Sequence, residues 1–197
     1  MSHPHSRSTL ALLAACALLM SACGAESQQE GPSEPLGESQ KGLVDGQQVK
    51  IRCDSGNCAN GQERCMYVEP TTLANGNPAV FVGACFMTVG RDARYHWTTF
   101  YNSATNAWRL QNHATFGCLH VDYSTRRLVT VACNSALLEQ NWQSVPSPTA
   151  GVTYLKSLAN VSSCAHPYFN NIAIGTPMHD WQCGADLVQD WNIEPLF

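Results

Sequence analysis

Apolar and polar residues alternate over short stretches through most of this chain, and the alternation predicts β-strands. Four runs show it best: "QQVKIRC" at 47–53, "AVFVGACF" at 79–86, "RLVTVAC" at 127–133 and "VTYLKSL" at 152–158. Connections rich in Gly, Asn, Ser and Thr separate these runs, and few windows keep the 3.6-residue period of a helix. Many short strands joined by turns are typical of a sandwich or a barrel.

The N-terminus has a different pattern, a continuous apolar run. "TLALLAACALLMSAC" at 9–23 follows the weakly basic start "MSHPHSR". A membrane-spanning helix needs about 20 apolar residues, so this run is too short to be one. Its length and flanks indicate a secretory signal peptide, which we place at residues 1–22.

The apolar run ends in "MSAC" before Gly24, a small-small-Cys pattern that resembles the lipobox of bacterial lipoproteins. The resemblance implies that Cys23 is lipidated and, because Gly24 is not Asp, that the lipoprotein reaches the outer membrane. "LAAC" at Cys16 is the better local match. Cleavage there would leave an apolar segment of only about six residues, and an odd number of cysteines. An ordinary cleaved signal peptide remains the alternative.

Residues 24–46 contain five acidic residues, one Lys and no aromatic residue. Such a segment cannot bury enough surface to become ordered, so we expect 23–46 to be a lipidated Cys and a disordered acidic linker. All seventeen Phe, Trp and Tyr residues lie after position 66, which places the folded domain at 47–197. That domain is close to neutral, and its longest basic cluster is the pair Arg126-Arg127. Nucleic acid is therefore not an expected partner.

Three segments of the domain repeat one arrangement of residues: a Cys, a second Cys and then a Trp. The Cys-to-Cys gaps are 20, 15 and 19 residues, and the Trp-to-Trp spacings are 45 and 49. In two segments a Gln stands two residues before the Trp, and in the first a Tyr takes its place. The repeated residues are Cys65, Cys85, Tyr95 and Trp97; Cys118, Cys133, Gln140 and Trp142; and Cys164, Cys183, Gln189 and Trp191. The pattern predicts a threefold structural repeat.

Three units with an early Cys and a late Gln-x-Trp resemble the ricin B-type lectin domain. The resemblance covers 47–197 and implies an all-β fold, a β-trefoil with pseudo-threefold symmetry. Six of its twelve strands would form a short barrel and six would cap it as hairpins. Because residues two apart in a strand point to the same side, we expect Gln140 and Trp142 to face the core together, and likewise Gln189 and Trp191.

The resemblance also implies one disulfide within each repeat: Cys65–Cys85, Cys118–Cys133 and Cys164–Cys183. Cys53 and Cys58, in "CDSGNC", are left over, and we pair them with each other. Metal binding by these thiols is the alternative, but export to an oxidising compartment favours disulfides.

The sugar pockets of this family have an Asp two residues after the first Cys and an aromatic residue two before the second. Here the first position holds Tyr67, His120 and His166, and the second holds Gly83, Val131 and Trp181. Repeat three keeps the aromatic residue and is the best candidate pocket, repeat two is weaker, and repeat one is structural. The candidate ligand-binding residues are His166, His179, Asp180, Trp181 and Gln189 in repeat three and His120 and Asp122 in repeat two. Packing roles for the aromatic and histidine residues are the alternative.

No catalytic motif is present: the chain lacks Gly-x-Ser-x-Gly, His-Glu-x-x-His and a phosphate-binding loop. A zinc site at His166, His179 and Asp180 would need three or four converging ligands, and we predict no metal or cofactor. We therefore expect a non-catalytic, membrane-anchored lipoprotein whose partners are glycans. The alternatives are a protein-interaction trefoil with degenerate sugar sites, similar to the trefoil subunits of cytolethal distending toxins, and a purely structural envelope protein.

Overall fold

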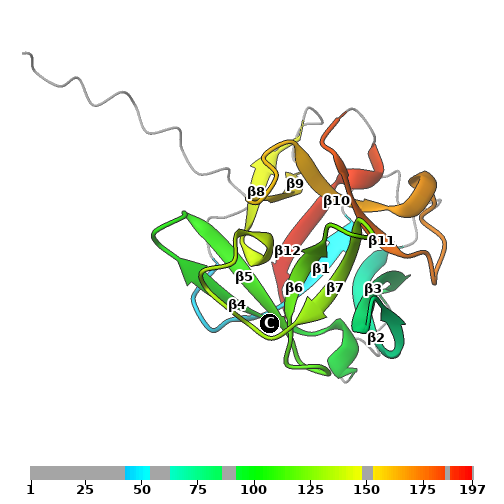
Figure 1. Cartoon of the computed structure of the whole chain (residues 1–197), viewed down its shortest axis with the longest axis horizontal. Coiled ribbons are helices and arrows are strands. Elements are labelled where there is room, and N and C mark those ends of the chain that lie inside the picture. Colours follow the sequence, from blue (N-terminus) through cyan, green and yellow to red (C-terminus); the bar gives the residue numbers. More distant parts are fainter. Residues whose placement is uncertain (1–42, 54–62, 86–91, 148–152, 185–186, 197) are drawn as a thin grey trace, which may run out of the picture. The chain divides into compact units, whose positions relative to one another are not determined.

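The computed structural model describes residues 43–53, 63–85, 92–147, 153–184 and 187–196, and across these ranges the chain is all-β apart from short 3-10 turns (Figure 1). The strands are β1 Gln48–Cys53, β2 Arg64–Ala74, β3 Asn77–Ala84, β4 Trp97–Asn102, β5 Ala107–Asn112, β6 Cys118–Asp122, β7 Arg127–Val131, β8 Trp142–Pro146, β9 Thr153–Ser157, β10 Ser163–Pro167, β11 Met178–Gln182 and β12 Trp191–Pro195. The 3-10 turns are η3 Ala93–Tyr95, η4 Leu138–Gln140, η5 Tyr168–Asn170 and η6 Leu187–Gln189.

The strands form three successive sets of four. The outer strands of each set pair in a ring, β1 with β4, β4 with β5, β5 with β8, β8 with β9 and β12 with β1. A bridge between Tyr154 and Asp190 joins β9 to the residue before β12 and completes the ring. The inner strands form the hairpins β2–β3, β6–β7 and β10–β11, and β7 pairs with both β3 and β11. Six barrel strands and three hairpins are the layout that the sequence resemblance implies.

The three hairpins share one register. In each hairpin, the first Cys of the repeat lies opposite the residue two before the second Cys. These opposed pairs are Cys65 with Gly83, Cys118 with Val131 and Cys164 with Trp181. The sequence repeat is therefore a repeat of structure, and one position can be compared across the three units.

Trp97, Trp142 and Trp191 each begin the last barrel strand of a unit, and all three are fully buried. They belong to a single cluster of buried apolar side chains that draws on all three units. The indole Nε1 of Trp142 donates to Leu119 O at 3.1 Å, and that of Trp191 to Val188 O at 3.1 Å. The expected sharing of one core by the three Trp residues is confirmed.

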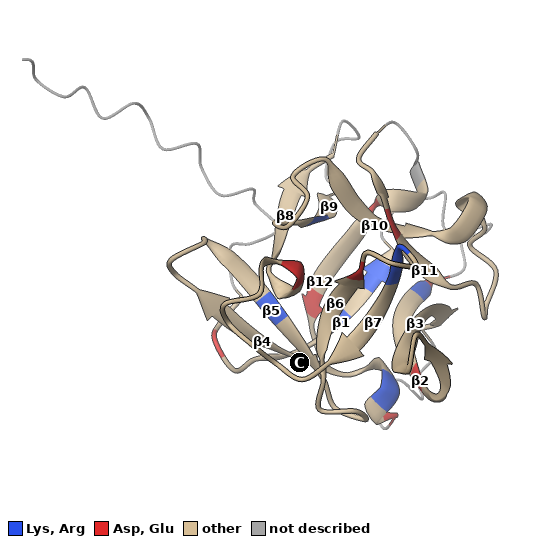
Figure 2. Cartoon of the chain, viewed as in Figure 1, with Lys and Arg blue, Asp and Glu red and all other residues tan. Residues whose placement is uncertain are grey.

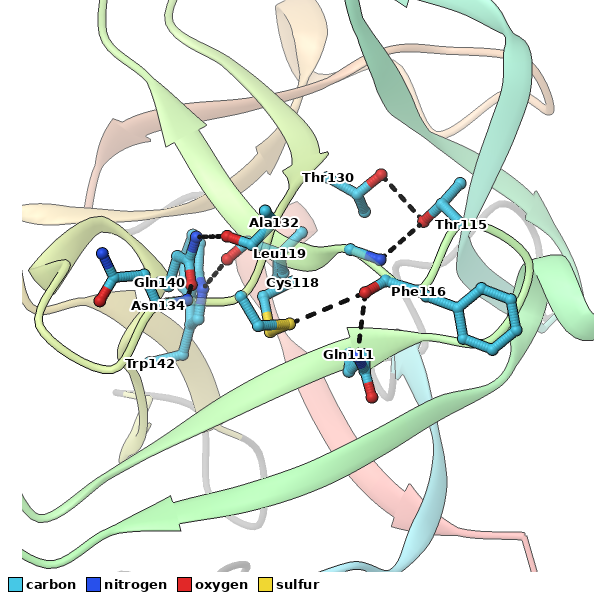
Figure 3. Close-up of a disulfide and its surroundings, with 12 residues drawn as sticks. Gln111, Thr115, Phe116, Cys118, Leu119, Thr130, Ala132, Asn134, Gln140 and Trp142 are labelled. Carbon is cyan, nitrogen blue, oxygen red and sulfur yellow. Dashed lines mark hydrogen bonds between the residues drawn. A yellow bond between two sulfur atoms is a disulfide. The ribbon is translucent and has the colours of Figure 1, made fainter.

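The Gln of the repeat is buried as predicted, but it lies in a 3-10 turn and not in the strand that was expected. Gln140 and Gln189 end the 3-10 turns η4 and η6, so strand alternation does not direct them inward; both are nevertheless fully buried. Gln140 Nε2 donates to Ala132 O at 2.9 Å, and its Oε1 accepts from Asn134 N at 2.7 Å (Figure 3). The side-chain amide thus bridges the peptide groups on both sides of Cys133.

The third unit repeats this bridge. Gln189 Nε2 donates to Gln182 O at 2.8 Å, and its Oε1 accepts from Gly184 N at 3.0 Å, so the peptides flanking Cys183 are held in the same way. In the first unit Tyr95 takes the Gln position and instead stacks on Tyr67, with ring centroids 5.1 Å apart.

The three disulfides within the repeats, Cys65–Cys85, Cys118–Cys133 and Cys164–Cys183, are confirmed. Cys53 is disulfide-bonded, and its predicted partner Cys58 lies outside the described residues. The predicted signal peptide, the lipidation site Cys23 and the linker as far as residue 42 also lie outside them.

The end of the predicted linker belongs to the folded domain. Gly46 N donates to Thr99 O at 2.8 Å, Thr99 Oγ1 donates to Val44 O at 2.8 Å, and Leu43 packs against the core cluster. Asp45 Oδ1 accepts from Tyr101 N at 2.8 Å. Residues 43–46 bond to β4 and pack on the core, so they belong to the domain. The folded domain therefore includes residue 43, four residues before the predicted start at position 47.

Replacing Gln140 by Ala tests the bridge across Cys133. The change removes a fully buried side chain with its hydrogen bonds to Ala132 O and Asn134 N, each of which contributes about 0.5–1.5 kcal/mol, and the cavity left behind adds to the loss. We expect the free energy of unfolding in urea, measured under oxidising conditions, to fall by about 3 kcal/mol. Gln143→Ala is the matched control, because that half-buried side chain only donates to Thr105 O and Asn106 O in the β4–β5 turn, and it should lose under about 1 kcal/mol. Equal losses in the two variants would contradict the bridge.

Candidate ligand pocket

A pocket of about 190 Å³ lies on the third hairpin. Its walls come from the end of β10, the turn η5 and β11. The lining residues are His166, Tyr168, Phe169, Asn170, His179 and Trp181. Three of them, His166, His179 and Trp181, were predicted from the sequence as ligand-binding residues, and the fold brings these three together.

Aromatic side chains form much of the wall and remain open to solvent. Trp181 is 57% exposed and Phe169 is 82% exposed. The Tyr168 ring stacks on His179 with centroids 4.5 Å apart, and its centroid lies 4.0 Å from that of Phe169. Exposed aromatic side chains gathered at a pocket mark a binding surface rather than a core.

The turn η5 holds Phe169 and Asn170 in the left-handed region, with φ of 53° and 57°. That conformation is rare for a large aromatic residue and is retained only where the surrounding structure imposes it. Tyr168 N donates to Pro177 O at 2.9 Å, which ties the turn to the chain entering β11. Tyr168, Phe169 and Asn170 were not predicted from the sequence, although the aromatic pair in "PYFNN" begins two residues after the predicted ligand-binding residue His166.

The two histidines of the pocket face each other across the hairpin, since His166 lies opposite His179. His166 is only 4% exposed. The Nε2 atom of His179 is buried and has no hydrogen-bond partner within the described part of the chain. Burial first, and then the charges of Arg127, His166 and Arg126, lower the pKa of His179 to about 4. The imidazole is therefore neutral at neutral pH, and its buried Nε2 carries hydrogen-bonding capacity that the described protein groups leave unmatched.

Asp180 and Gln189, predicted as ligands, do not line the pocket. Asp180 alternates with His179 and Trp181 along β11, so its side chain points to the opposite face, where it is 1% exposed. Its Oδ1 atom accepts from Arg126 Nη2 at 3.3 Å. Gln189 is buried and bonded to backbone on both sides of Cys183. The structure gives both residues supporting roles.

The second unit has no comparable pocket wall. Its predicted ligand Asp122 accepts from Ser124 N at 3.0 Å and from Thr125 Oγ1 at 2.9 Å, and so fixes the turn between β6 and β7. His120 is half-buried on β6, and burial lowers its pKa against the opposing effect of nearby acids. Val131 stands where the third unit has Trp181. The platform position beside His120 therefore holds no aromatic residue, although the carboxylates of Glu139 and Asp122 lie close enough to act on the imidazole.

In the first unit the space over the hairpin is filled. A Cβ on Gly83 would lie 2.5 Å from Tyr95 Oη and 2.7 Å from a Tyr67 ring atom. An aromatic residue at position 83 would clash with these rings, so the first unit cannot form a platform like that of the third.

Within the described ranges, no three His, Cys, Asp or Glu side chains are grouped so that they could hold a metal ion. The same ranges contain no helix of the length and apolarity needed to cross a bilayer.

No family model matches the chain, and no curated protein matches it either. Solved structures do match. The chain is similar to the designed 3-fold symmetric protein ThreeFoil, with a TM-score of 0.59 at 11% identity over 76% of this chain and 99% of that one. It is also similar to the ricin B-like lectin of Macrolepiota procera, solved in complex with lactose, with a TM-score of 0.58 at 16% identity over 78% of this chain and 98% of that one.

A third match is a mosquitocidal holotoxin, with a TM-score of 0.63 at 16% identity. It covers 79% of this chain but only 18% of the toxin. A galactosidase from Clostridium perfringens is likewise matched over only 33% of its length. At these identities the likeness establishes the fold: an all-β domain shared with ricin B-like lectins and with a threefold-symmetric design.

The depressed pKa of His179 predicts sensitivity to acid. The unfolded chain binds the proton near the ordinary pKa of 6.5, whereas the folded chain binds it only near 4. The unfolded state is thus favoured as pH falls through about 6.5 toward 4. In thermal unfolding between about pH 7.5 and pH 4.5, the Tm of the wild type should fall more steeply than that of His179→Gln. A constant difference between the two proteins across this range would contradict the assignment.

Proposed function

We propose that this domain is a β-trefoil of the ricin B type, with pseudo-threefold symmetry, that binds carbohydrate through the pocket of its third unit. The supporting observation is the exposed Trp181 indole beside His166, His179 and Asn170 in one pocket. A sugar ring has an apolar face that stacks on an aromatic side chain and hydroxyl groups that need donors and acceptors. The pocket offers both.

Two similar structures add support, because they were solved with glycans. One is the Macrolepiota procera lectin in complex with lactose. The other is the Polyporus squamosus lectin bound to Neu5Acα2-6Galβ1-4GlcNAc, at 13% identity and a TM-score of 0.57. We propose binding without catalysis or a cofactor for this chain, since its pocket offers an aromatic platform and neutral polar groups.

The proposal includes lipidation at Cys23 and a place in the bacterial envelope, at the outer membrane. A single open pocket of this size would bind a sugar weakly. Copies anchored side by side in a membrane would engage several sugars of one polysaccharide at once, which raises the overall affinity.

A protein partner is the second candidate, and the exposed apolar side chains around the pocket favour it. Phe169 and Tyr168 line the pocket and are 82% and 44% exposed, and Ile174, in the connection between η5 and β11, is 57% exposed. The similarity to part of a holotoxin is consistent with a binding component that serves a larger assembly. Under this alternative the same face would bind a protein surface and show no affinity for free glycans.

Trp181→Ala on a glycan array tests the proposed function. Loss of the platform should weaken glycan binding by about tenfold or more while the thermal unfolding midpoint stays near that of the wild type. Phe116→Ala is the matched control: Phe116 is also an exposed aromatic residue, at 74%, but it belongs to the second unit and should leave binding unchanged. Unaltered array binding by Trp181→Ala would refute the site. A wild-type protein that binds no glycan but captures an envelope protein through Trp181 would support the alternative.

A further inference from the structure

We propose that the third-unit pocket selects acidic glycans, sugars that bear a carboxylate or a sulfate, through Arg127 and His179. This inference rests on the proposed carbohydrate-binding function and names its ligand class. The lining of the pocket contains two imidazoles, an amide and three aromatic rings but no carboxylate. An anionic ligand would therefore meet no like charge in the pocket wall.

Arg127 is positioned beside the pocket by a contact between two units. In the register pair that joins β7 to β11, Arg127 stands directly opposite His179. Opposed residues of antiparallel strands project to the same face, with Cβ atoms about 5 Å apart. The Arg127 side chain therefore leaves the sheet on the face where His179 lines the pocket. Basic positions lie where β7 meets β11 (Figure 2).

The guanidinium of Arg127 is uncommitted. It is half-buried, and within the described ranges it has neither an ion pair nor a hydrogen bond. The neighbouring Arg126 differs, because it pairs with Asp180 at 3.3 Å. Asp122, which lies opposite Arg127 in the β6–β7 hairpin, is already bonded to Ser124 and Thr125. Within the described ranges Arg127 therefore carries a guanidinium that pairs with neither acid, although the Asp122 carboxylate across the hairpin keeps its negative charge.

The electrostatic field at His179 is positive, as is the charge of Arg127. After burial, the causes that lower its pKa are the positive charges of Arg127, His166 and Arg126. Its buried Nε2 lacks a partner within the described ranges. An anion between this nitrogen and the guanidinium would gain charge-assisted hydrogen bonds and would pair with the charge of Arg127. The planar fork of an Arg also fits the two oxygens of a carboxylate or sulfate.

The test compares matched acidic and neutral glycans on the folded wild-type protein: sialyllactose and sulfated lactose against lactose, and a glucuronate oligosaccharide against its glucose counterpart. We expect the acidic member to bind about tenfold more tightly at low salt, with the advantage shrinking as salt screens the charges. Preference for carboxylated sugars alone, or for sulfated sugars alone, would support the inference and identify the source of the anion.

Arg127→Gln should abolish the acidic preference and leave the binding of neutral sugars unchanged. Arg109→Gln is the matched control, because Arg109 is a half-buried Arg on β5 outside the pocket, and it should keep the preference. Equal binding of acidic and neutral sugars, or a preference that survives in Arg127→Gln, would overturn this inference while a Trp181-dependent site still stood. Failure of the wild type to bind any glycan would overturn the proposed function and this inference together.

Discussion

Three indole side chains that no single unit can bury by itself hold this domain together. Trp97, Trp142 and Trp191 begin the last barrel strand of their respective units and meet in one apolar cluster. A four-stranded unit alone would leave such a side chain in water, at a cost of a few kcal/mol each. The barrel closes only when β12 pairs with β1, so residues near both ends of the domain must be in place before the core is complete.

The same core fixes the candidate pocket. Gln189, two residues before Trp191, is fully buried. Its side-chain amide donates to Gln182 O and accepts from Gly184 N. Gln182 directly follows Trp181, so the end of the strand that presents the exposed indole is tied to the interior. The pocket is thus built on a rigid hairpin that the core and the Cys164–Cys183 bridge both restrain, which limits the ordering cost of binding a ligand.

The arrangement of strands and the disulfides within the repeats could be predicted through the family resemblance that the recurring Cys and Trp residues carry, and the burial of the three Trp residues followed from the repeat itself. The role of Gln140 was predicted with the wrong local geometry, since a three-residue 3-10 turn leaves no periodic signal. The orientation of Asp180 was available from strand alternation, which places it opposite His179 and Trp181. Two features could not be read from sequence: the left-handed turn at Phe169 and the meeting of Arg127 with His179. The turn depends on how η5 packs, and the meeting depends on pairing between different units.

Hydrogen exchange at the indole Nε1–H groups, followed by NMR at several urea concentrations, tests the interdependence of the three units most directly. Trp97, Trp142 and Trp191 should exchange only through global unfolding, with one common free energy and one common dependence on urea, while the exposed Trp181 exchanges without protection. If one of the three core indoles exchanged through a separate opening of much lower free energy, its unit would unfold independently. The account of a single shared core would then be wrong.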